Sequence, residues 1–195
     1  MTADPGASTA TTPPAPASAS SGAAKLLIPF GIGAAVALTL GVYGKVHEPT
    51  GIAVNIAGFS GPLTVKVWLA SGAFVLAIVQ LVTALAIFGK LGMSARPWVN
   101  ALHRWSGRAA FLLAVPVAIH CLYAVGFSAF DARALVHSLL GCFFFGAFTV
   151  KMLILPKRGL PGWALPVMGG LVFTALVGLW FTSSLWFFTT HGVKF

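Results

Sequence analysis

Residues 109–125 of the chain read AAFLLAVPVAIHCLYAV, and residues 134–150 read ALVHSLLGCFFFGAFTV. Both runs are apolar enough to lie within a lipid bilayer, and the short break GFSAFDAR at residues 126–133 separates them. Because a hydrocarbon core of about 30 Å needs about 20 mainly apolar residues, this pattern predicts two antiparallel membrane-spanning helices joined by a tight turn. His120 and His137 would then lie at one depth, near one face of the bilayer.

The composition of the whole chain also indicates an integral membrane protein. Its 195 residues are 58% hydrophobic and 8% charged, and the mean hydropathy is +0.94. We therefore expect an all-α fold, a membrane helical bundle of five transmembrane helices. The predicted spans are residues 26–43, 65–88, 102–125, 134–155 and 163–188.

The amino-terminal segment differs from the rest in composition. Residues 1–24 are rich in Ala, Ser, Thr and Pro and carry one charged side chain. Such a segment buries too little apolar surface to fold, so we predict a disordered tail over residues 1–24 and a single transmembrane domain over residues 25–195. The tail lacks the basic region of a secretory signal, so the first span is expected to be retained.

The net charge of +9 is interpreted as a membrane-orientation signal. No basic cluster is interleaved with aromatic residues on a polar surface, so nucleic-acid binding is excluded. Cationic residues concentrate in and beside the second and fourth loops: Lys90, Arg96, Arg104, Arg108, Lys157 and Arg158. Because cytoplasmic loops carry the excess of Lys and Arg, the chain is predicted to lie in the cell membrane with its amino terminus inside and its carboxyl terminus outside.

The two intramembrane histidines predict a cofactor. Histidine is costly in hydrocarbon and usually faces the interior of a bundle. Two imidazoles on neighbouring helices suit the axial positions of a haem iron, so His120 and His137 are predicted as metal ligands of one haem b near the outer face. A second haem would need a histidine about 14 residues along each helix, on the same face, but those positions hold Ser106 and Lys151. The alternative is an interhelical hydrogen-bonding pair without a cofactor.

Three further residues are candidates for cofactor binding. Gly141, one turn after His137, would let a flat macrocycle approach the helix backbone, or would serve helix packing. Arg133, four residues before His137, would pair with a haem propionate or be an ordinary helix-end charge. His103 would be an interfacial side chain, or part of a lower site for a quinone or a second cofactor.

Two blocks carry a resemblance to known families. The runs HRWSGRAAFLLAVPVAIHCLYAVGF (residues 103–127) and HSLLGCFFFGAFTVKMLIL (residues 137–155) resemble an uncharacterised family of actinobacterial multi-pass membrane proteins. Within these two spans the chain is also loosely similar to cytochrome b561-like and ferric-reductase-like transmembrane domains, which hold b haem between helical histidines. This second resemblance implies that His120 and His137 are axial ligands. Ser106 and Lys151 depart from the two-haem pattern of those domains.

These observations predict a b-type cytochrome or the membrane anchor of a redox complex. One haem would pass electrons between quinol and an extracytoplasmic redox partner. The only carboxylic side chains, Asp4, Glu48 and Asp131, lie outside the predicted spans, so an electron-transfer subunit is expected rather than a stand-alone enzyme. The alternative is a cofactor-free membrane subunit that scaffolds or assembles a larger complex.

Overall fold

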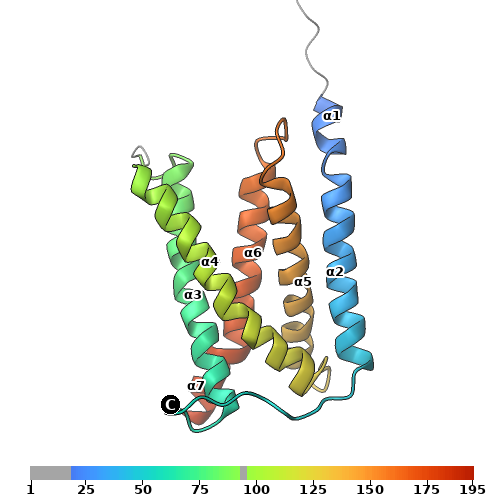
Figure 1. Ribbon diagram of the computed structural model, residues 1–195, viewed down its shortest axis with the longest axis vertical. Coiled ribbons are helices and arrows are strands. Elements are labelled where there is room, and N and C mark those ends of the chain that lie inside the picture. Colours follow the sequence, from blue (N-terminus) through green and yellow to red (C-terminus); the bar gives the residue numbers. More distant parts are fainter. Residues whose placement is uncertain (1–18, 93–95) are drawn as a thin grey trace, which may run out of the picture.

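The computed structural model describes residues 19–92 and 96–195, and within them the regular structure is entirely helical. Five helical stretches are long and apolar enough to cross a membrane, which confirms the predicted five-span bundle (Figure 1). The chain is therefore a multi-pass membrane protein. The stretches are α2 (Leu27–Val46), α3 (Pro62–Ile87), α4 (Pro97–Ile119) continued by η1 (His120–Val125), α5 (Ala132–Ile154), and α6 (Ala164–Trp180) continued by η2 (Phe181–Leu185) and α7 (Trp186–His191).

Two boundaries differ most from the sequence-based expectations, and the other span ends differ by a few residues. The tail predicted to be disordered lies outside the described residues up to residue 18, but its last six residues form the short helix α1 (Ala19–Ala24). The third span begins at Pro97 and not at Leu102. Proline is favoured in the first turn of a helix, because its missing N–H is not needed there, and this outweighs the polar residues that follow.

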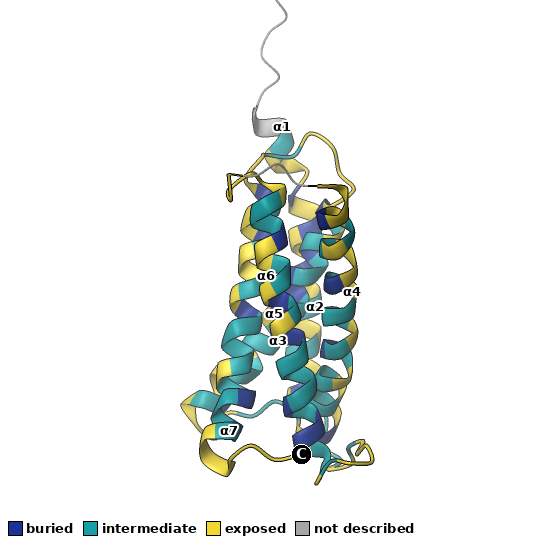
Figure 2. Ribbon diagram, turned by 90° about the vertical axis from the view of Figure 1, so that its left-hand side faces the viewer, coloured by how far each residue is buried: buried dark blue, intermediate teal, exposed yellow. Residues whose placement is uncertain are grey.

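The helices pack in antiparallel pairs and leave apolar side chains facing outward. α3 packs against α4, α2 against α5, and α5 against α6. Exposed residues lie along the outer sides of these helices as well as in the loops (Figure 2). They include large apolar side chains such as Leu38 and Leu112, both 69% exposed. Such a surface is stable in lipid and would be a liability in water.

The helix α4 crosses the other helices diagonally (Figure 1). It starts beside α3 and ends near α2 and α5, where the following turn docks on α2 through a hydrogen bond from Phe127 N to Gly44 O of 2.6 Å. The carboxyl terminus lies at this same end, where Trp68 Nε1 donates to Lys194 O at 2.8 Å. We call it the carboxyl-terminal end of the bundle.

Two π-helical segments lie toward the carboxyl-terminal end. η1 begins one turn after Pro116, and Gly126 N donates to Cys121 O at 2.8 Å in the five-residue pattern of a π-helix. η2 is inserted between α6 and α7. π-helical turns are rare and frequently occur at functional sites. The space between η1 and η2 is therefore a candidate for the functional site.

Candidate functional site

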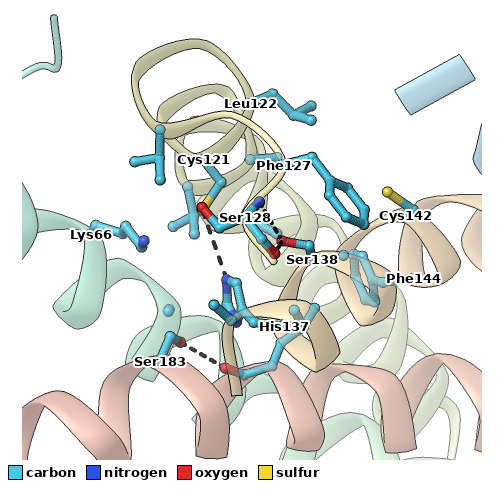
Figure 3. A pocket seen from close by; sticks show the side chains of 18 of the residues that line it. Lys66, Cys121, Leu122, Phe127, Ser128, His137, Ser138, Cys142, Phe144 and Ser183 are labelled. Carbon is cyan, nitrogen blue, oxygen red and sulfur yellow. Dashed lines mark hydrogen bonds between the residues drawn. The ribbon is translucent and has the colours of Figure 1, made fainter. Parts of the chain in front are cut away.

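A cavity of about 290 Å³ lies between α3, α4, η1, α5, α6 and η2, toward the carboxyl-terminal end. Its walls are mainly apolar, with small residues contributed by α4 and aromatic side chains by α5. The polar groups at its edge include Lys66, Arg133, His137 and Ser183, shown in part in Figure 3. A smaller space of about 60 Å³ shares these four residues and adds Thr182.

His137 is the imidazole of this cavity. Its Nδ1 lies 2.9 Å from Thr182 Oγ1, and Thr182 Oγ1 in turn donates to Gly178 O at 2.8 Å. A hydroxyl has one hydrogen, so the Thr182 oxygen accepts from His137 Nδ1–H. The Nε2 atom then carries the lone pair, which is the tautomer that a metal-ligating histidine needs.

His120 does not join His137 at the cavity. The neighbouring residue, Cys121, lines it instead, with its Sγ atom 4.0 Å from His137 Nε2 (Figure 3). The lining positions of this helix include Ala114, Ala118 and Cys121, at spacings of four and three residues. His120 is not among the residues that line the cavity. The structure therefore brings one of the two predicted ligands, His137, to the cavity and not the other.

Arg133 lines the cavity but is already engaged with neighbouring groups. Its guanidinium donates to Thr182 O at 2.9 Å and lies 3.7 Å from the Asp131 carboxylate. The same group lies over the Trp186 ring, 3.9 Å from its centroid. These contacts join the start of α5 to η2 and α7, so Arg133 also has a structural role.

Gly141 faces open space. A Cβ atom added there would meet only Leu179 Cδ2, at 4.0 Å. By contrast, a Cβ atom at Gly146 would lie 2.7 Å from Gly33 O, and one at Gly178 would lie 2.7 Å from Leu140 Cδ1. Gly146 and Gly178 therefore permit close helix packing, whereas Gly141 keeps part of the cavity wall free of a side chain.

His103 lies in a separate polar cluster between α3 and α4, near the opposite end. Its Nδ1 is 2.8 Å from Thr83 Oγ1, and Thr83 donates to Val79 O at 2.7 Å. Gln80 donates to His103 O and to Ser106 Oγ, as expected of a polar side chain that joins two membrane helices. His103 is not among the residues that line the cavity.

Lys66, Thr182 and Ser183 were not recognised as site residues from the sequence. Thr182 and Ser183 belong to the run TSS at residues 182–184, late in an otherwise apolar span, and this polar run was the available signal. Lys66 lies near the start of α3, where a lysine is normally assigned to the membrane interface. Only the packing of α3 beside η2 shows that it lines the cavity.

Comparison with known proteins places the chain in a family without placing it near a characterised protein. No curated protein and no solved structure matches it. A family model described as a family of unknown function, DUF6529, matches residues 26–195, which include all five spans. This match agrees with the predicted membership of an uncharacterised membrane-protein family and gives no link to cytochrome b561-like or ferric-reductase-like proteins. The chain belongs to the family DUF6529.

Proposed function

We propose that the cavity at the carboxyl-terminal end binds one haem b through His137, and that the chain is a membrane electron-transfer protein. The observation that carries this proposal is the position of His137 at the cavity, with Nδ1 2.9 Å from Thr182 Oγ1 and with Nε2 facing the cavity residue Cys121. With Thr182 Oγ1 donating to Gly178 O, the ring is assigned as Nδ1–H, and Nε2 is the nitrogen that could bind iron. Within residues 19–92 and 96–195 no group of three or more His, Cys, Asp or Glu side chains could hold a metal ion. A porphyrin supplies four of the iron's ligands itself, so one histidine is sufficient.

The other cavity residues suit the two chemical parts of a haem. Phe144 and Phe145 offer apolar surface for the macrocycle, and the cations Lys66 and Arg133 make one end of the cavity positive, where an acidic edge would be favoured. The volume of about 290 Å³ is near the lower end of the range of about 300–1,000 Å³ for small-molecule sites, so haem binding requires lining side chains to rearrange.

Of the two predicted histidine ligands only His137 lines the cavity, so one protein nitrogen would hold the iron. A bound haem would supply one-electron chemistry. His137 would hold it near Thr182, and the mainly apolar walls would limit the access of water. Thr182 keeps the imidazole in one orientation, as outer hydrogen-bond partners of metal ligands do.

The loop charges support an orientation for this site. Lys90, Arg96, Lys157 and Arg158 lie toward the end opposite the cavity, which we propose to be cytoplasmic. The cavity then lies near the outer face. There we propose that the chain, with a bound haem, would take electrons from quinol in the bilayer and pass them to an extracytoplasmic redox partner.

The test is a reduced-minus-oxidised absorption spectrum of the detergent-purified protein, expressed with ample haem. We expect a haem Soret band that shifts on reduction, and about one haem b per chain by pyridine haemochrome assay. A folded but colourless protein would contradict the proposal. That result would instead support a cofactor-free subunit of a larger membrane complex.

Enlarging the residue at position 141 is expected to block haem binding. Gly141→Leu would place a side chain in the cavity, whereas Gly141→Ala adds one methyl group with nothing closer than 4.0 Å. We expect the leucine variant to lose most of its haem and the alanine variant to keep it, measured as haem per chain. Gly170→Leu is the matched control, because a Cβ atom at this exposed position meets nothing within 4 Å. Equal haem content in both Gly141 variants would argue against this cavity as the site.

A further inference from the structure

The two cations of the cavity differ in how their charge is used. Arg133 has a carboxylate, a backbone carbonyl and an aromatic ring as partners, in Asp131, Thr182 and Trp186. Lys66 has no hydrogen bond or ion pair with any described residue. Its ammonium group points from α3 toward Cys121 and His137 (Figure 3). Lys66 therefore keeps its full capacity to bind an anion.

No carboxylate of the described chain is placed to neutralise Lys66 within the cavity. Glu48 lies in the loop after α2, and Asp131 pairs with Arg133 and caps α5 by accepting from Ala134 N at 2.6 Å. Neither side chain lines the cavity. An unpaired ammonium at the edge of an apolar space is costly, and a pairing anion would offset that cost.

The position of Lys66 defines the shape of the ligand that would supply the anion. Lys66 lines both the large cavity and the smaller space beside Thr182, so it lies at the polar end of the site. The remainder of the large cavity is mainly apolar, with Phe144 and Ala118 among its walls. The complementary ligand is an amphiphile with an acidic group at one edge and a large apolar body.

We propose that Lys66 binds a carboxylate of the cavity's ligand and, resting on the proposed function, that this carboxylate is a haem propionate. Arg133 keeps its internal partners and holds α5 against η2. Lys66 thereby orients the porphyrin with its acidic edge toward the carboxyl-terminal end of the bundle, while His137 holds the iron.

The test compares haem with haem dimethyl ester, in which both propionates are methylated and uncharged. We expect the wild-type protein to bind haem roughly 10- to 100-fold more tightly than the ester, since hydrogen bonds to charged groups are the stronger ones. Lys66→Gln should lose most of this preference by weakening haem binding alone, and Lys66→Arg should retain it. Lys45→Gln removes an exposed cation at the same end and should leave the preference unchanged.

The outcomes separate this inference from the proposed function. Wild-type protein that binds neither porphyrin would overturn both. Wild-type protein that binds haem, with the same preference over the ester in Lys66→Gln, would overturn the role of Lys66 and leave the haem site standing. Thermal unfolding of each variant in detergent shows whether it is folded. A Lys66→Gln variant that unfolds is replaced by Lys66→Met, which keeps the aliphatic stem and must also lose the preference.

Discussion

Replacing His137 with alanine is expected to abolish haem binding, with loss of the haem Soret band and a fall in haem per chain to near zero. Neither His120 nor His103 is placed to replace it, because His120 is not among the described residues that line the cavity and His103 lies in a separate cluster. Without an axial nitrogen, the porphyrin would be held by apolar contacts and by its propionates alone. The measurement is the pyridine haemochrome assay on purified, folded protein.

Two controls distinguish ligation by His137 from a general effect on folding. His120→Ala removes a histidine of nearly the same depth that does not line the cavity, so we expect it to keep its haem. His137→Gly leaves room for a free imidazole, which should restore haem binding and the Soret band when added to the protein with haem. Equal haem loss in His120→Ala and His137→Ala would show that the bound state pairs both histidines, contrary to the geometry described above.

Thr182 offers a subtler test of the same site. Thr182→Val keeps the shape of the side chain but removes the oxygen that accepts from His137 Nδ1–H. Because outer partners of metal ligands typically contribute 10- to 100-fold in affinity, we expect haem to bind about 10- to 100-fold more weakly. Affinity measured by haem titration checks this expectation, and an unchanged affinity would contradict the positioning role of Thr182.

Replacing Gly146 with valine is expected to detach α2 from α5. A Cβ atom at Gly146 would lie 2.7 Å from Gly33 O and 2.9 Å from Ala37 Cβ. A Cβ atom at Gly33 would likewise meet Gly146 O at 2.7 Å and would clash with Val150. The obstructing atoms include helix backbone, which cannot turn aside as a flexible side chain does. Small residues at such crossings are what let membrane helices pack closely.

We expect Gly146→Val to lower the free energy of unfolding by about 3 kcal/mol, at the upper end of the usual cost of overpacking. For a domain of this size that corresponds to a fall in melting temperature of roughly 6–12 °C. Thermal unfolding in detergent measures it. Gly170→Val adds the same atoms at an exposed position of α6 and should change the melting temperature little. A melting temperature equal to that of the control would show that α2 and α5 do not need this close approach.

The five spans could be predicted from the sequence because length and apolarity alone decide whether a helix crosses a bilayer. The ends of these spans were harder to predict where a proline is followed by polar and charged residues. The third span shows this, since Pro97 begins it despite the polar run that contains His103 and Arg104. The pattern of apolar residues does not show where a helix begins when the start is set by a proline in its first turn.

Of the two histidines predicted as ligands, His137 lines the cavity of the structure and His120 does not. Both lie toward the same end, yet which side of α4 faces inward depends on how this helix crosses the bundle and on the π-helical turn at its end. Neither feature leaves a clear periodic signal in residues 109–125, which are almost entirely apolar. The contributions of Lys66 and Thr182 likewise depend on helices that are distant in sequence.

The pairing of α2 with α5 has a consequence for biosynthesis. During translation α2 enters the membrane first, but its main partner emerges only after α3 and α4 have been made. The segment that contains α2 has a mean hydropathy of 2.0, so it is apolar enough to reside alone in lipid during this interval. The face of α2 that contains Gly33 has no α5 to pack against until the fourth span is inserted. A nascent chain stopped before residue 132 would therefore hold α2 without its main partner, open to capture by chaperones or membrane proteases.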